Sequence, residues 1–277
     1  MREQGPNRAH VLSVLNLKGG VGKTHAVWLL ACGCIERGKR ILLLDTDAQG
    51  NLSNSFVDAS SGLKGIEQLI DPSREPDIRS VIRRTSYDSV DIVPSSFAVS
   101  SFDISDQRAW EFADLQRSFV DAIETVRADY DLIVFDCPPR LSLVSFAALV
   151  ASDGVIVPLE AADWGAQGIL QVGEAVAYVR QQQNAALKLV GYLVSRFKGN
   201  RTFQRTYEAE LRQHFGTLLF DTVLPDLAAF ERAVTLRVPI TQREPRSRGA
   251  AITRAFLSEV LRRIREDGCG GVSQNDQ

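Results

Sequence analysis

The sequence predicts an α/β fold: a doubly wound, mostly parallel sheet with helices on both faces. Short apolar runs alternate along the chain with longer segments of helical periodicity, the order typical of βαβ units. Several of these runs are continuous rather than alternating, as expected of strands that are buried on both faces. A glycine-rich loop also stands between the first apolar run and the first helical segment.

The expected elements follow this alternation in order. Strands are expected at 11–16, 40–45, 90–94, 131–135, 154–158, 188–195 and 218–221. Helices are expected at 22–37, 110–128, 142–151, 165–183, 203–214 and 248–266, with short helices at about 65–70 and 77–84. No segment has the length and composition of a linker. We therefore predict one domain over residues 10–266, between a flexible segment at 1–9 and a disordered tail at 267–277.

The composition is that of a globular protein with a sizeable core, since 44% of the 277 residues are hydrophobic and 24% are charged. The net charge is −2, so binding of nucleic acid would need a local basic patch. No apolar run reaches the roughly 18 residues of a membrane span, and the polar start lacks the features of a signal peptide. The four cysteines have no metal-ligand spacing, which favours buried thiols in a cytoplasmic protein.

Residues 18–24 read Lys-Gly-Gly-Val-Gly-Lys-Thr, a run that predicts a phosphate cradle. Glycines let the backbone fold around an anion, and the N–H groups of the loop and of the following helix point at phosphate oxygens. Lys23 is expected to reach the β- and γ-phosphates, and the Thr24 hydroxyl to hold Mg²⁺. The alternative is a glycine-rich turn without a ligand, but a strand and a helix flank the loop as the motif requires. The nucleotide contacts expected in this loop are Gly19, Gly20, Val21, Gly22, Lys23 and Thr24.

Two further strands end in carboxylates. Asp45 and Asp47 lie at the end of one apolar run, and Asp136 ends another. The carboxyl ends of parallel strands meet in one crevice, where ligands of open α/β sheets collect. Mg²⁺ prefers oxygen ligands and keeps several waters, so we expect Thr24 to bind it directly and Asp45 and Asp136 to act through water.

Together these motifs resemble the deviant Walker A ATPases of the ParA/MinD family, and the ParA branch in particular. The general loop pattern needs glycine at position 17, whereas this chain has Leu17 followed by Lys18, on the family's signature lysine. Residues 45–51 resemble the family's Asp-x-Asp-Pro-Gln-Gly-Asn element, and Asp136-Cys-Pro-Pro resembles its Walker B end. Residues 245–249 resemble a stretch before its last helix, so the resemblance runs from about residue 10 to 266.

The resemblance implies a P-loop NTPase fold, ATP and Mg²⁺ as cofactors, and slow, Mg-dependent, partner-stimulated ATP hydrolysis. It implies three catalytic residues. Lys23 contacts the phosphates of its own subunit, and Lys18 crosses a dimer interface to the phosphates of the other subunit, as an arginine finger does. Asp47 positions or deprotonates the attacking water. The alternatives are a solvated loop lysine for Lys18 and a loop cap for Asp47. Residues 49–51 continue the segment that begins at Asp45, the first of the family's switch loops. Such a loop is ordered when the γ-phosphate is bound and becomes disordered when it is lost.

The same resemblance places the adenine beside Arg196, Pro225 and Asp226, with Asp226 accepting from the amino group. A plain surface-loop role for these residues is nearly as consistent with the sequence. His25, which stands where the family has a second Thr or Ser, is also expected to contact the nucleotide. Arg140, which directly follows Pro138 and Pro139, is a second departure from the family's pattern, which has a small residue there.

The expected partners are a second copy of the chain, joined on ATP binding, nonspecific DNA, and a ParB-like or cargo-adaptor activator. The residues expected to contact DNA are Arg196, Lys198, Arg201 and Arg205. The alternative is a solvated charged face, since acids are interspersed here, and the two family arginines after Pro225 are absent. The protein would thus be cytoplasmic and nucleoid-associated, and would segregate a plasmid or chromosome.

Four other functions remain open from the sequence. The cargo could be a protein assembly such as a microcompartment or a chemoreceptor array. A MinD-like protein would use its last helix at a membrane, but packing of that helix on the sheet explains its periodicity equally well. A scaffold would bind nucleotide with little turnover. A redox ATPase would need paired cluster cysteines, and Cys137 alone lies near a switch.

Overall fold

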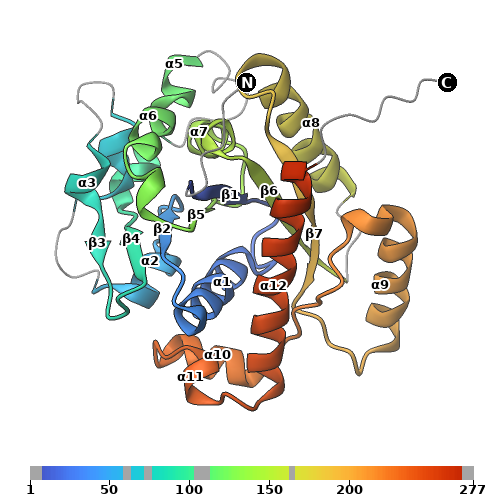
Figure 1. Cartoon of the computed structure of the whole chain (residues 1–277). Helices are drawn as coiled ribbons and strands as arrows, with labels where there is room; N and C mark the ends of the chain where they lie inside the picture. Colours follow the sequence, from blue (N-terminus) through green and yellow to red (C-terminus); the bar gives the residue numbers. More distant parts are fainter. Residues whose placement is uncertain (1–7, 59–63, 72–76, 103–112, 162–165, 270–277) are drawn as a thin grey trace.

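The computed structural model of the chain describes residues 8–58, 64–71, 77–102, 113–161 and 166–269 (Figure 1). Most of the predicted flexible segment 1–9, and residues 270–277 of the predicted tail, lie outside this part. The last helix continues to Cys269, beyond its predicted end at residue 266. The domain boundaries stay predictions.

Seven strands form one sheet in the order β3-β4-β2-β5-β1-β6-β7. All neighbouring strands are parallel except β3 and β4. The strands are β1 (His10–Val14), β2 (Ile41–Asp45), β3 (Arg83–Arg84), β4 (Val90–Val93), β5 (Leu132–Asp136), β6 (Gly154–Glu160) and β7 (Lys188–Ser195). The predicted doubly wound, mostly parallel sheet is therefore confirmed.

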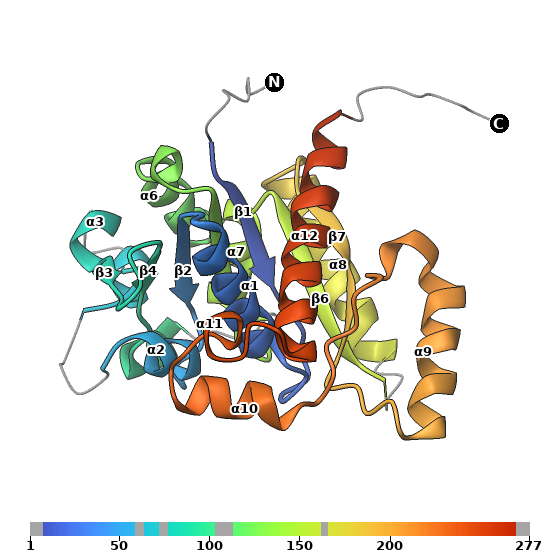
Figure 2. The ribbon, with the colours of Figure 1, turned by 60° about the horizontal axis from the view of Figure 1, so that its bottom comes forward.

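Helices cover both faces of this sheet (Figures 1 and 2). The core on one face includes α1, α10, α11 and α12, and the core on the other includes α6, α7 and α8. The helices are α1 (Lys23–Arg37), α2 (Asn51–Phe56), α3 (Ile78–Val81), α5 (Ala113–Gln116), α6 (Ser118–Glu124), α7 (Leu143–Ala151), α8 (Ala166–Gln182), α9 (Thr202–Phe215), α10 (Ala228–Thr235), α11 (Ile240–Arg243) and α12 (Arg248–Cys269). Short 3₁₀ helices are η2 (Ile66–Leu69), η3 (Phe97–Phe102), η4 (Arg127–Asp129) and η5 (Gly216–Leu218).

The continuous apolar strands supply both cores at once. In β5, Ile133 and Phe135 belong to the core under α6, α7 and α8, while Leu132 and Val134 belong to the core under α1 and α12. Successive side chains of a strand point to opposite faces, so a strand covered on both sides needs apolar residues at every position.

Three predicted elements are wrong in form. The short helix predicted at about 77–84 is helical only over α3, and its last two residues form strand β3. Residues 218–221 make only an isolated bridge, between Tyr192 and Leu219. The Leu219 carbonyl instead accepts a hydrogen bond from Arg263 Nη2 of α12, at 2.7 Å. The long helix predicted at 110–128 breaks into α5, α6 and η4, and its first three residues lie outside the described part.

The sheet register brings the carboxyl ends of three strands together. Asp45 of β2 pairs with Asp136 of β5, and Val14 of β1 pairs with the same Asp136. Parallel pairing in this register places the loop after β1 next to both carboxylates. Helix α1, which follows that loop, packs closely on α12, since a Cβ added at Gly33 would lie 2.9 Å from Leu257 Cδ2.

Candidate functional site

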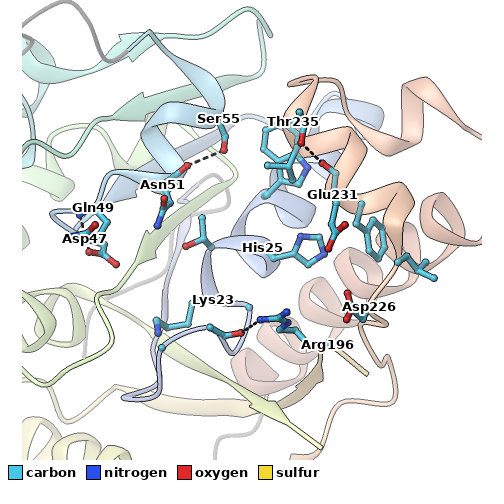
Figure 3. Close-up of a pocket in the computed structure, with 18 of the residues that line it drawn as sticks. Lys23, His25, Asp47, Gln49, Asn51, Ser55, Arg196, Asp226, Glu231 and Thr235 are labelled. Atoms are coloured by element: carbon cyan, nitrogen blue, oxygen red, sulfur yellow. Dashed lines mark hydrogen bonds between the residues drawn. The ribbon is translucent and has the colours of Figure 1, made fainter. Parts of the chain in front are cut away.

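A pocket of about 690 Å³ opens at this edge of the sheet. Figure 3 shows it between the loop after β1, the segment that leads into α2, and helix α10. Its lining residues are Gly19, Gly20, Gly22, Lys23, Thr24, His25, Trp28, Asp47, Gln49, Asn51, Ser55, Pro139, Arg196, Pro225, Asp226, Leu227, Phe230, Glu231, Val234 and Thr235. The volume lies within the usual range for small-molecule sites.

The glycine loop has the conformation that its sequence predicts. Gly20 and Gly22 have φ of 77° and 85°, in the left-handed region that favours glycine, and Gly22 caps α1. The end of β7 holds the loop from outside, since Ser195 Oγ donates to the Val21 carbonyl and Arg196 Nη1 donates to the Gly20 carbonyl at 2.9 Å. The cradle is thus preorganised by contacts from a strand more than 170 residues later in the chain.

The two lysines of the loop lie in different environments. Lys23 is only 7% exposed, and its Nζ donates to the Lys18 carbonyl at 3.0 Å. Burial lowers the pKa of Lys23, and the neighbouring carboxylate of Asp136 partly offsets that effect. The side chain of Lys18 is 45% exposed, and its Nζ lies 3.7 Å from Glu160 Oε2 at the end of β6. Lys23 is therefore an internal cation, whereas Lys18 is accessible from outside the loop.

Asp45 and Asp136 form a buried pair of carboxylates. Asp45 accepts hydrogen bonds from Ser53 N, Ser53 Oγ and Asp47 N, at 2.8, 2.6 and 3.2 Å. Its pKa is nevertheless raised to about 6, because burial outweighs these contacts. Burial and the charge of Asp45 raise the pKa of Asp136 well above its ordinary value. Neither oxygen of Asp136 has a partner of normal hydrogen-bond geometry among the described residues, although the nearby Thr24 hydroxyl favours its charged form.

The segment after β2 turns back on itself through Asp47. Asp47 Oδ1 accepts from Gln49 N at 3.0 Å, and the Asp47 carbonyl accepts from Gly50 N at 2.8 Å. Gly50 then caps α2 with a φ of 62°. The carboxylate of Asp47 consequently lies at the pocket rim, with the side chains of Gln49 and Asn51 beside it (Figure 3).

The predicted adenine residues do come together at the pocket. Phe197 N donates to the Leu224 carbonyl, and Asp226 N donates to the Phe197 carbonyl, which joins the loop after β7 to the loop containing Pro225. Asp226 Oδ2 forms an ion pair with Lys198 Nζ at 2.9 Å. The adenine role of Asp226 stays a prediction, and Lys198 lies against the pocket loop rather than at a separate basic face.

One wall of the pocket was not expected from the sequence. Helix α10 contributes Phe230, Glu231, Val234 and Thr235, and α1 contributes Trp28. Phe230 packs on His25, with ring centroids 4.9 Å apart, and burial lowers the pKa of His25 to about 4. The spacing of Leu227, Phe230 and Val234 is helical, and this signal could have identified α10.

Comparisons with known proteins agree with this geometry. A family model described as an AAA domain matches residues 9–189. The sporulation initiation inhibitor protein Soj of Bacillus subtilis is 30% identical over 260 residues, covering 90% of this chain and 97% of Soj. The chromosome-partitioning ATPase Soj of Thermus thermophilus is 32% identical over 260 residues, covering 92% of this chain and 96% of that protein. This chain belongs to the ParA/MinD family of P-loop ATPases.

Solved structures of similar fold include nucleotide complexes. Cobyrinic acid a,c-diamide synthase from Mycobacterium smegmatis, with bound ADP and magnesium, has a TM-score of 0.77 and 25% identity, covering 93% of this chain and 96% of that one. A complex of a Cyanothece McdA variant with ATP has a TM-score of 0.79 at 16% identity, covering 97% of this chain and 100% of that one, and shows the fold alone. Nucleotide hydrolysis is thus supported as the general activity of this ParA/MinD-family chain.

The four residues predicted to bind DNA divide into two pairs. Arg196 and Lys198 contact the pocket loops, as described above. Arg201 precedes α9 and Arg205 lies in its first turns, and both are exposed. Within the described part of the chain neither arginine forms an ion pair, although Arg205 donates to Thr202 Oγ1 at 3.4 Å. The DNA role of this group stays a prediction for a ParA/MinD-family member.

Three observations concern the membrane-associated and redox alternatives. The apolar face of α12 is buried, with Phe256, Leu257 and Val260 at 0% exposure in the core that includes α1. Among the described residues, no helix combines the length and apolarity needed to cross a membrane. Cys137 is 1% exposed, and burial raises the pKa of its thiol to about 12, as expected of an inert buried cysteine.

Proposed function

We propose that this chain is a ParA-type ATPase whose ATP-bound form is a face-to-face dimer that binds nonspecific DNA. Hydrolysis, stimulated by a ParB-like or cargo-adaptor protein, releases the dimer, and repeated cycles segregate or position DNA. The relatives named chromosome-partitioning ATPase and Soj support this proposal. Its setting would be the cytoplasm, in association with the nucleoid.

The observation that carries the proposal is the difference in exposure between the two lysines of the loop. Lys23 is buried inside its own loop, where it faces the pocket. Lys18 is on the outside of the same loop, where its side chain is 45% exposed and lies near Glu160. A cation that is accessible at the rim of a phosphate site can serve the phosphates of a second subunit, as an arginine finger supplied in trans does.

The residues present fit ATP with Mg²⁺. The loop offers backbone N–H groups at a helix N-terminus together with the Lys23 ammonium, a donor set suited to phosphates. Mg²⁺ bound with the nucleotide would neutralise phosphate charge, and Thr24, Asp45 and Asp136 are the residues that would hold it. The buried oxygens of Asp136 support this assignment, because among the described residues they have no partner of normal hydrogen-bond geometry, and such acceptors need a donor or a cation.

Asp47 supplies the remaining chemistry. Its carboxylate lies at the pocket rim, and a hydrogen bond from Gln49 N holds it in place. We infer that it orients or deprotonates the attacking water. Phosphoryl transfer needs mainly positioning and charge neutralisation, so one oriented carboxylate is sufficient for this role.

The test is sedimentation of the purified chain with Mg²⁺ and ATP, with and without plain duplex DNA. We expect a monomer without nucleotide, a dimer with ATP when turnover is blocked by Asp47→Ala, and co-sedimentation with DNA only in the ATP state. Lys18→Ala should bind ATP yet remain monomeric, whereas Lys39→Ala, at a lysine outside the pocket that pairs with Asp131, should behave as the parent chain. A parent chain that stays monomeric with saturating nucleotide would contradict the proposal.

A further inference from the structure

His25 lies between the two ends of the pocket. In the chain it directly follows Thr24 of the phosphate cradle, and its ring packs on Phe230, which follows the loop of Pro225 and Asp226. Figure 3 shows the imidazole in the space between Lys23 and helix α10. The sugar of a nucleotide connects the phosphates to the base, so residues at this position face the sugar.

The imidazole offers unused hydrogen-bonding groups. A neutral histidine carries one N–H donor and one acceptor nitrogen. Within the described part of the chain, no hydrogen bond or ion pair involves the ring of His25. Its one aromatic ring contact there is with Phe230. Because the ring lines the pocket, a ligand there can reach its nitrogens.

Packing fixes the position of this ring. Phe230 is 2% exposed and lies against the start of α12, since a Cβ added at Gly249 would lie 3.1 Å from Phe230 Cε1. The two rings meet at 60° with centroids 4.9 Å apart, a favourable tilted arrangement. His25 is therefore held in place before any ligand binds.

Glu231 supplies an acceptor on the opposite wall. It is the residue after Phe230 on α10, it lines the same pocket, and Figure 3 shows it extending from α10 toward His25. Its carboxylate is exposed and makes no ion pair with any described residue. The other acid at this end, Asp226, is already paired with Lys198. An acidic side chain that accepts from ribose hydroxyls is a recurrent way to bind the sugar of a nucleotide.

We propose that His25 and Glu231 bind the ribose hydroxyls of the nucleotide, so that the site selects ribonucleotides over 2′-deoxyribonucleotides. This inference rests on the proposed ATP site and adds a specificity that the phosphate cradle cannot provide, because ATP and dATP have identical phosphates. The two residues act as a pair, with the carboxylate accepting from one hydroxyl and the imidazole bonding its neighbour. Loss of either side chain leaves a hydroxyl without its partner.

The experiment compares equilibrium binding of ATP, 2′-dATP and 3′-dATP in the presence of Mg²⁺. The variants are Glu231→Gln, His25→Phe, which keeps an aromatic ring against Phe230, and His25→Asn, which keeps a donor and an acceptor. Glu210→Gln is the charge-matched control, because Glu210 is exposed on α9 outside the pocket. A nucleotide that binds the native chain should also raise its Tm, which provides a second readout.

We expect the parent chain to bind ATP about tenfold more tightly than either deoxynucleotide, the effect of one lost hydrogen bond to a polar site. Glu231→Gln and His25→Phe should bring the three affinities within about twofold of one another, mainly by weakening ATP. His25→Asn should restore part of the preference, and Glu210→Gln should retain all of it.

Two results would overturn this inference while leaving the proposed function intact. One is equal affinity of the parent chain for ATP and 2′-dATP. The other is a preference for ATP that persists in both Glu231→Gln and His25→Phe. Failure of the parent chain to bind any of the three nucleotides would instead refute the proposed ATP site, and this inference with it.

Discussion

The buried carboxylates at the ends of β2 and β5 should destabilise the nucleotide-free chain while supporting Mg²⁺ in the nucleotide complex. The substitution Asp136→Asn tests both effects. Asp45 and Asp136 are register partners, and both are buried. Asp136→Asn removes a buried charge without removing a hydrogen bond of normal geometry, since neither carboxylate oxygen has one among the described residues. We therefore expect the nucleotide-free variant to be more stable than the nucleotide-free parent chain.

Asp45 gives the scale of the effect. Its pKa is raised from 3.8 to about 6. That difference of about two pKa units corresponds to about 3 kcal/mol against the charged form. Burial is the largest cause of the raised pKa of Asp45 and of Asp136, so the shift of Asp45 indicates the cost of burying a charged carboxylate at this edge of the sheet. Removing the charge of Asp136 should then raise the free energy of unfolding by about 2 kcal/mol, or the Tm by roughly 4–8 °C.

The pH dependence has a definite sign. The native pKa values of both carboxyl groups lie above their ordinary values, and that of Asp45 is about 6 instead of 3.8. Between these values the native chain binds more protons than the unfolded chain, so the free energy of unfolding falls as the pH rises through the interval. Asp136→Asn should reduce this slope, because it removes one of the two titrating groups.

The assay is urea unfolding followed by circular dichroism, first with EDTA and then with Mg²⁺ and ATP. The parent chain should gain stability from the nucleotide by mass action, whereas the variant should gain much less because it lacks an oxygen that supports Mg²⁺. The m-values should be equal, so that the midpoints compare stabilities directly. A lower midpoint for the variant than for the parent in EDTA would refute the reasoning.

Four other outcomes are expected. Lys23→Ala should weaken ATP binding by about a hundredfold, because a buried ammonium at the cradle is lost, and unchanged affinity in calorimetry would contradict this. Asp47→Ala should bind ATP normally but hydrolyse it about 10²-fold more slowly, as a phosphate-release assay can show. Arg201→Glu with Arg205→Glu should weaken duplex DNA binding and reduce its log–log salt slope by roughly 2, and a slope equal to the parent's would place the DNA face elsewhere. Gly33→Ala should destabilise the fold by about 1–2 kcal/mol, since its Cβ would lie 2.9 Å from a side chain of α12, and an unchanged urea midpoint would count against that packing.

The sequence predicts the strands of the sheet centre well, because each is a continuous apolar run that serves two cores. The runs that became β1, β2 and β5 were placed within about two residues, the usual error at strand ends. Residues 218–221 have the same apolar character, yet they make a single bridge because Arg263 of α12 takes a carbonyl there. Such a long-range competitor leaves no trace in the local pattern.

Helix α10 shows the opposite case. Ala228–Thr235 is only eight residues long and follows the loop that contains Pro225, so its helical spacing extends over barely two turns. Its apolar face carries Phe230, which makes it the wall of the nucleotide pocket. Short helices depend on tertiary packing more than on their own propensity, so the helical spacing of Leu227, Phe230 and Val234 is a weak signal until Phe230 is seen to be buried.

The sequence by itself determined the glycine loop between β1 and α1, the order of most strands and helices along the chain, and the family. These depend on local sequence patterns, since a glycine-rich turn between a strand and a helix, followed by Lys and Thr, predicts a phosphate site without reference to the rest of the fold. Tertiary structure alone decided which groups share the pocket. Only the folded chain brings Arg196 to the Gly20 carbonyl, pairs Lys198 with Asp226, and sets His25 against Phe230. Each of these contacts joins residues that are distant in sequence, and their positions follow from the strand register and from the packing of α1 on α12.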